Sequence, residues 1–225
     1  IAFQSVNLVF PLITVPYISR ILGPDGIGLY SYSLSITQYF IIIGSIGLTV
    51  YGTRQIAYTR DDRKCMSNNF WSIVIIRSVT LGTSLFIYVL MVFTFENNKL
   101  LFLIQGLVIF AAIIDISWLY SGTENFKKII KRNLLVKIVG IIGIFLLVKE
   151  REDLILYVWL NVGMAVIGNL TLFLQLAKVV DFSLPDRLSV SSHFLPSLRL
   201  FLPQIATQIY LLLDKTLLGL LADME

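Results

Sequence analysis

Six ionisable side chains fall inside long apolar stretches of this sequence. A charged side chain at the centre of a membrane helix costs about 2.5 to 3.5 kcal/mol, whereas one Leu or Ile returns only about 0.3 to 0.6 kcal/mol. A lining built from such residues would be positive overall and would attract an anionic group, since Coulomb energies are large where the dielectric constant is low. Four of the six are basic and two are acidic: Arg77, Lys137, Arg199, Lys215, Asp115 and Asp214.

Large amide side chains recur along the same apolar stretches. Gln4 and Asn7 lie one turn apart, and Gln204 repeats the position of Gln4 two hundred residues later. Residues three or four apart share one face of a helix, and a lipid-facing helix has no use for a polar face. Packing between helices explains the smaller Ser and Thr residues equally well. We predict that four amides face a polar lumen: Gln4, Asn7, Gln38 and Gln204.

The remaining reactive residues exclude several other kinds of site. A single cysteine, Cys65, forms no internal disulfide, and a single histidine, His193, cannot build a Cys/His metal site. No Ser/His/Asp triad or pair of carboxylates stands out, and the basic residues do not form one stripe with interleaved aromatics. We therefore expect no enzyme, no metal or cofactor, and no nucleic-acid partner.

The composition indicates the elements that must position these side chains. Of 225 residues, 56% are hydrophobic and 14% are charged, and the mean hydropathy is +0.82. A soluble domain is about 25% charged. We predict an all-α, polytopic membrane bundle, because backbone groups in lipid must satisfy one another. Seven spans are expected: Ile1–Ser19, Leu29–Tyr51, Phe70–Phe95, Leu100–Tyr120, Asn133–Val148, Leu154–Ala177 and Leu195–Ala222.

The basic residues between these spans alternate in number. The connections after spans two, four and six hold ten: Arg54, Arg60, Arg63, Lys64, Lys127, Lys128, Lys131, Arg132, Lys178 and Arg187. The other three connections hold four: Arg20, Lys99, Lys149 and Arg151. By the positive-inside rule, the first set and the N-terminus are expected on the cytoplasmic side.

Each buried charge also has a purely structural interpretation. Arg77, Lys137 and Arg199 lie toward the more basic end of their spans, so their side chains can extend to the interface. Asp115 is too short to do so and could instead pair with Lys137 or Arg77. Two charges near the far end of the last span, Asp214 and Lys215, could cap that helix.

Several segments resemble one family of bacterial membrane proteins, and the likeness extends over almost the whole chain. The segments are VPYISRILGP at residues 15–24, LYSYSLSI at 29–36, YGTRQIA at 51–57, DISWLYSGTENF at 115–126 and DKTLLG at 214–219. They are similar to the polysaccharide-biosynthesis flippases, which move O-antigen and capsule repeat units and share a superfamily with multidrug exporters. The resemblance implies a six-helix lobe over residues 1–180, followed by a linker and the first helix of a second lobe over 181–225.

The resemblance also implies a function and a set of partners. The expected cargo is an undecaprenyl-pyrophosphate-linked oligosaccharide, flipped across the bacterial cytoplasmic membrane by alternating access. Membrane lipids, a polysaccharide polymerase and the export machinery are the other expected partners. Arg77, Lys137, Arg199 and Lys215 would bind the pyrophosphate, with Asp115 and Asp214 as ion-pair or coupling residues. A cation-coupled multidrug exporter and an inactive, truncated remnant are the alternatives, and the chain is expected to be a fragment of a longer protein.

Overall fold

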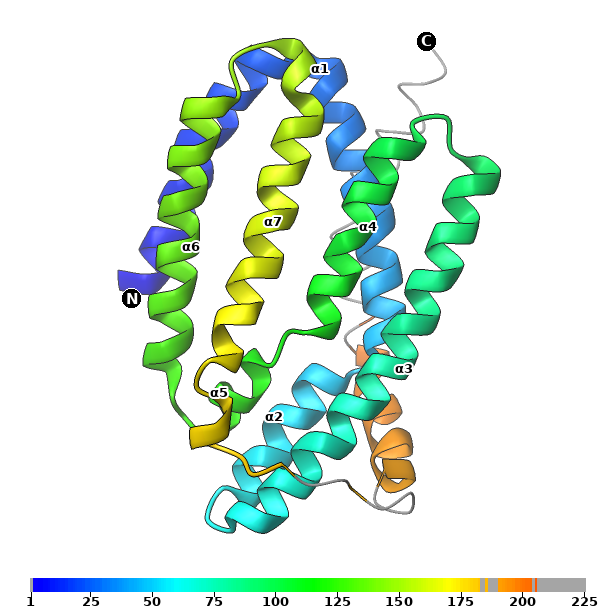
Figure 1. Cartoon of the computed structure of the whole chain (residues 1–225), viewed down its shortest axis with the longest axis vertical. Helices are drawn as coiled ribbons and strands as arrows, with labels where there is room; N and C mark the ends of the chain where they lie inside the picture. Colours follow the sequence, from blue (N-terminus) through cyan, green and yellow to red (C-terminus); the bar gives the residue numbers. More distant parts are fainter. Residues whose placement is uncertain (1, 183–184, 186–189, 204, 206–225) are drawn as a thin grey trace.

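The structure is a computed structural model that describes residues 2–182, 185, 190–203 and 205, with side chains from Leu12 onward. Every regular element in this part of the chain is helical, and Figure 1 shows the long helices side by side in an antiparallel bundle. Residues 190–203 add a further helical stretch. The α-helices are α1 (Ala2–Ser45), α2 (Leu48–Thr59), α3 (Arg63–Phe95), α4 (Lys99–Ile113), α5 (Ser117–Gly122), α6 (Phe126–Leu147) and α7 (Leu154–Phe173).

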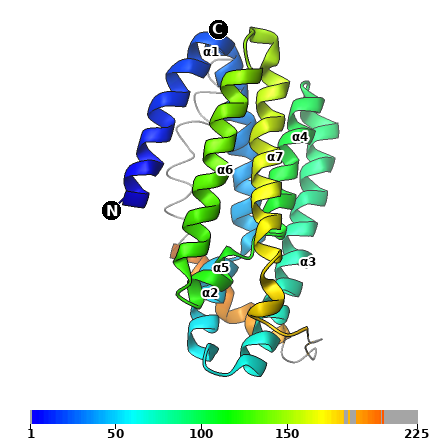
Figure 2. The same ribbon diagram turned by 60° about the vertical axis from the view of Figure 1, so that its left-hand side comes forward.

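Helix α1 contains the first two predicted spans and folds back on itself at one residue. Gly23 has φ 70° and ψ 177°, a conformation that strongly favours glycine, and it separates helical residues 2–22 from 24–45. Figure 2 shows that the N-terminal part of α1 slants away from α6, with the chain end farthest from it. The predicted connection over residues 20–28 was therefore too long, because Pro24 fits the first turn of the next helix.

The second predicted span also ends earlier than expected. Helix α1 stops at Ser45, where Ile46 and Gly47 adopt positive φ angles of 44° and 70°, and the chain then turns into the short helix α2. A Cβ atom on Gly47 would lie 2.6 Å from the carbonyl oxygen of Ser197, so the missing side chain lets the 190–203 segment pack here. The span predicted from hydropathy extended to Tyr51 because α2 begins with apolar residues.

The fourth predicted span, Leu100–Tyr120, is interrupted. Helix α4 ends at Ile113, residues 114–116 are not helical, and α5 resumes at Ser117. Non-helical backbone at membrane depth is tolerated where neighbouring protein groups satisfy its polar atoms. Asp115 lies in this interruption, so the charged residue marks a break in the helix that its apolar neighbours conceal.

Within the described part of the chain, four stretches are long and apolar enough to cross a membrane: Leu12–Ser45, Arg63–Phe95, Lys99–Gly122 and Arg151–Lys178. Helix α6 is not among them because it carries five basic residues, Lys127, Lys128, Lys131, Arg132 and Lys137. The connections after the second, fourth and sixth predicted spans lie at one end of the bundle, and the other three connections lie at the opposite end, as far as the structure describes them (Figure 1). We call the end with α2 and α5, where the more basic connections lie, the basic end.

Close contact between the helices depends on small residues and hydroxyl groups. The Tyr88 ring of α3 lies against Gly106 of α4, and its hydroxyl donates to the carbonyl of Phe102 at 2.8 Å. Ser84 donates in the same way to Phe40 at 2.7 Å. Tyr88 is fully buried in the cluster that joins α3, α4 and α7. This cluster packs α4 against α3 and α7 along the part of α4 that precedes its end at Ile113.

Candidate functional site

The broken end of α4 is held by side chains from two other helices, α3 and α7. The Nε of Arg77, on α3, donates to the carbonyl of Ala112 at 2.9 Å, and one of its terminal nitrogens donates to the Thr49 hydroxyl on α2 at 2.9 Å. The Asn169 amide on α7 donates to the carbonyl of Ala111 at 2.7 Å. Arg77 is only 4% exposed. In this arrangement its guanidinium joins helices α2, α3 and α4.

Asp115 organises the start of α5 and interacts electrostatically with two arginines. Its carboxylate accepts from the backbone N–H of Ser117 at 2.9 Å, and its carbonyl accepts from the Trp118 indole at 3.1 Å. The carboxylate attracts both Arg77 and Arg132, with no direct ion pair to either among the described residues. Asp115 thus interacts electrostatically with Arg77, one of its two expected partners. The other expected partner, Lys137, lines a cavity between α6, α7 and the first part of α1.

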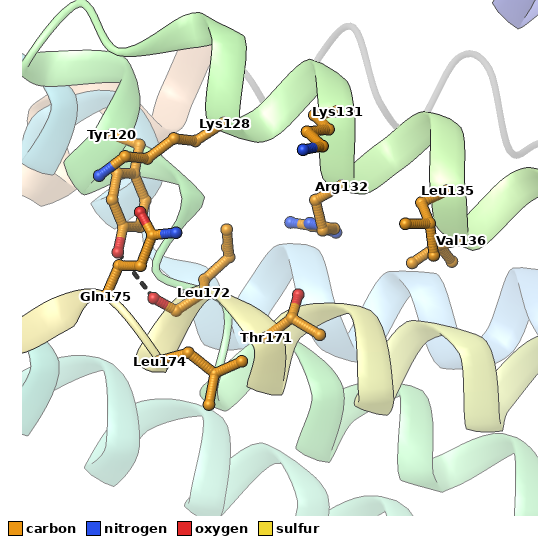
Figure 3. Close-up of a pocket in the computed structure, with 10 residues that line it drawn as sticks. All are labelled: Tyr120, Lys128, Lys131, Arg132, Leu135, Val136, Thr171, Leu172, Leu174 and Gln175. Carbon is orange, nitrogen blue, oxygen red and sulfur yellow. Dashed lines mark hydrogen bonds between the residues drawn. The ribbon is translucent and has the colours of Figure 1, made fainter.

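A cavity of about 290 Å³ opens between the start of α6 and the end of α7, at the basic end. Figure 3 shows Lys128, Lys131 and Arg132 on the α6 side and Thr171 and Gln175 on the α7 side. We call this cavity the basic pocket. Its remaining lining residues are aromatic or aliphatic: Tyr120, Leu135, Val136, Leu172 and Leu174.

Two contacts define the wall of the basic pocket. The ammonium group of Lys128 lies 5.1 Å from the centre of the Tyr120 ring, a cation–π arrangement. The Tyr120 hydroxyl is itself fixed, because it donates to the carbonyl of Leu172 at 2.6 Å. Tyr120 is fully buried. The pocket therefore has a rigid aromatic side against which one of its cations rests.

Arg132 is the innermost cation of the basic pocket, and one of its donors is unused. Its Nε is buried and has no hydrogen-bond partner among the residues that the structure describes. One terminal nitrogen lies 3.6 Å from the place that a Cβ atom on Gly168 would occupy, so this glycine lets the guanidinium lie against α7. A buried donor without a partner costs about 1 to 3 kcal/mol, more when it is charged. An acceptor entering the pocket would remove that cost.

A second cavity of about 280 Å³ adjoins the basic pocket, and Val136 lines both. It lies between α6, α7 and the first part of α1, and Lys137, Asn161 and Thr14 supply its polar groups. Lys137 follows Lys128 by nine residues, which is about 14 Å along a helix axis. We call this the inner cavity, because it lies that much further from the basic end.

Among the described residues, the charged side chains that line these two cavities are all basic, namely Lys128, Lys131, Arg132 and Lys137. We call these four residues the basic row. Charges of one sign around low-dielectric walls concentrate ions of the opposite sign. The arrangement is therefore suited to binding an anionic group that moves along α6.

The structure brings together only some of the residues predicted from sequence. Lys137 lines the inner cavity, Arg77 lies in the core, and Arg199 is exposed in the helical stretch over 190–203. Gln38 is half-buried in α1. The side chains of Gln4 and Asn7, and the whole of Gln204, Asp214 and Lys215, lie outside the described part of the chain. The predicted substrate-binding roles of all these residues remain predictions.

Sequence reasoning missed three of the four cations of the basic row. Lys128, Lys131 and Arg132 were counted only as connection residues that report topology. Their spacing contained a usable signal, because residues three and four apart share one helix face. Hydropathy concealed it by starting the fifth span at Asn133, whereas α6 begins at Phe126.

The whole sequence, residues 1–225, matches the family described as polysaccharide biosynthesis protein. The chain belongs to this family. A curated relative, named "Putative O-antigen transporter" in Escherichia coli (strain K12), is 26% identical over 138 residues. That match covers 60% of this chain and 33% of the relative, so the chain matches about a third of the relative's length. No solved structure is significantly similar to this polysaccharide biosynthesis protein.

Proposed function

We propose that this polysaccharide biosynthesis protein forms part of a transporter that flips an undecaprenyl-pyrophosphate-linked oligosaccharide across the bacterial cytoplasmic membrane by alternating access. The inner cavity is the observation that carries the proposal, since among the described residues its one charged lining residue, Lys137, is basic and no acidic residue lies there to repel a diphosphate. The family and the relative named as an O-antigen transporter support the kind of cargo. The basic end faces the cytoplasm, in agreement with the positive-inside rule.

In this proposal the diphosphate reaches the inner cavity and contacts Lys137. A lysine on a flexible stem follows a moving phosphate as a point charge, while the adjacent Asn161 amide offers donors to phosphate or sugar oxygens. Arg77 contacts the pyrophosphate only if its bonds to Ala112 and Thr49 exchange during the transport cycle. Residues 1–180 form one lobe, and 181–225 lead into a second.

The multidrug-exporter alternative is disfavoured by the sign of the cavity charge. Organic cations need acidic or aromatic surroundings, and a basic lining repels them. If the chain is instead an inactive remnant, substitutions in its cavities are predicted to leave polysaccharide export unchanged.

Export of surface polysaccharide tests the proposal. Lys137→Gln in the chromosomal gene keeps the side chain's approximate length and removes its charge. We expect at least a tenfold loss of export at an unchanged protein level, whereas Lys149→Gln, in an exposed connection at the opposite end, exports normally. The proposal fails if Lys137→Gln exports as well as Lys149→Gln. Efflux of an organic cation by the unmodified protein would instead favour the multidrug alternative.

A further inference from the structure

The basic pocket differs from the inner cavity in its surroundings as well as its depth. Its rim carries two leucines whose side chains face outward: Leu135 is 57% exposed and Leu174 is 82% exposed. In a helix that crosses a membrane, outward-facing aliphatic side chains contact acyl chains. The pocket therefore combines a cationic interior with an apolar rim.

The basic pocket lies toward one end of a membrane-crossing stretch, the level at which lipid head groups are expected. Thr171 and Gln175 line it and lie near the end of the membrane-crossing stretch Arg151–Lys178. Along α6, Lys128 and Arg132 are four residues apart, and Leu135 follows within one more turn. One turn therefore separates the cations from Leu135, as the phosphate of a lipid is separated from its acyl chains.

The cations of the pocket lack a protein counter-ion. Within the described residues no carboxylate forms an ion pair with Lys128, Lys131 or Arg132, and the buried Nε of Arg132 has no acceptor. Asp115 acts on Arg132 only from a distance. The most concentrated anions at this level of a membrane are phosphates of anionic lipids, and basic pockets between membrane helices are known to bind such head groups.

We propose that the basic pocket binds the head group of an anionic phospholipid of the surrounding bilayer. The phosphate accepts from Arg132 and from Lys128 and Lys131, while the acyl chains run over Leu135. This ligand is a structural lipid rather than the cargo, so the site goes beyond the transport proposed above and does not depend on it.

Lipid binding to the purified chain tests this site. Native mass spectrometry from dodecyl maltoside counts the lipids that remain bound to the protein after addition of phosphatidylglycerol, phosphatidylcholine or inorganic phosphate. We expect one phosphatidylglycerol to bind at least tenfold more tightly than phosphatidylcholine, with binding weakened by salt. Arg132→Gln and, separately, Lys131→Gln each lower that affinity about tenfold, and Lys178→Gln, at the same end but outside the pocket, leaves it unchanged.

Each other outcome overturns the proposal in a recognisable way. Equal binding of both lipids shows an apolar groove without head-group recognition. Equal competition by inorganic phosphate shows an anion site that ignores the lipid. Because Lys131 is exposed, its substitution should not unfold the chain, so unchanged binding by that variant also contradicts the proposal. Failure of the Lys137 export test, with phosphatidylglycerol binding intact, would reject the transport proposal alone.

Discussion

Substitution of Arg77 separates a structural role from a substrate-binding role. Arg77→Met keeps most of the side-chain volume but removes the charge and both hydrogen bonds, at 2.9 Å each, to Ala112 and Thr49. Each buried acceptor left without a partner costs about 1 to 3 kcal/mol. Ala112 also accepts from backbone N–H groups at the end of α4, and removal of a buried charge recovers some solvation energy. We therefore expect a loss of about 2 to 4 kcal/mol in unfolding free energy.

Arg77→Lys provides the decisive comparison, because it keeps the charge but cannot reproduce the forked geometry of guanidinium. Unfolding is followed by tryptophan fluorescence as dodecyl sulfate is added to protein in a mild detergent, and export is measured in parallel. If Arg77 holds the helix break, both variants unfold at lower dodecyl sulfate than the unmodified protein. If Arg77 instead binds the pyrophosphate, Arg77→Lys keeps substantial export and both variants are as stable as the parent, which would refute the structural reasoning.

Two further predictions concern packing and pH. A Cβ on Gly52 would lie 2.6 Å from the buried Trp118 ring, so Gly52→Ala should destabilise the bundle by about 1 to 3 kcal/mol in the same unfolding assay. Gly82→Ala is the control: a Cβ there would have nothing within 4 Å, so this variant should be neutral or stabilising. Equal effects of the two substitutions would contradict the packing of Gly52 against Trp118. Burial lowers the pKa of His193, whose Nδ1 lies 2.7 Å from the Tyr51 hydroxyl. Its contribution to stability should be complete above about pH 6.5 and fall at lower pH, where the unfolded chain takes up a proton that the folded chain resists. The protection factors of amides in residues 190–203, which correct for their slower intrinsic exchange in acid, should thus be lower at pH 5.5 than at pH 7.5, and His193→Gln should abolish the difference.

The helical class and the approximate positions of the spans could be predicted because lipid leaves few alternatives to a continuous helix. Hydropathy found the apolar stretches, and the count of basic residues separated the two ends of the bundle. Both signals are averages over many residues. They could not locate the stop at Ser45 or the break after Ile113, because single backbone conformations and specific hydrogen-bond partners decide those points.

The residues of the candidate site could likewise be predicted only in part from the sequence. Lys137 stood out because it lies among apolar residues, and the structure places it in a cavity. Arg77 stood out for the same reason but lies in the core, since hydropathy cannot distinguish a charge that lines a lumen from one that satisfies a broken helix. Arg132 did not stand out, because its local sequence is rich in charge.

The sequence by itself determined that this is a helical membrane protein with one strongly basic end, because transfer energies depend mainly on residue type and position along the chain. Only the tertiary structure decided which cations share a cavity. Gly168 on α7 allows Arg132 to lie against that helix, and Asp115 in the break after α4 interacts electrostatically with both Arg132 and Arg77. These relations join residues that are far apart in sequence, and no local pattern records them.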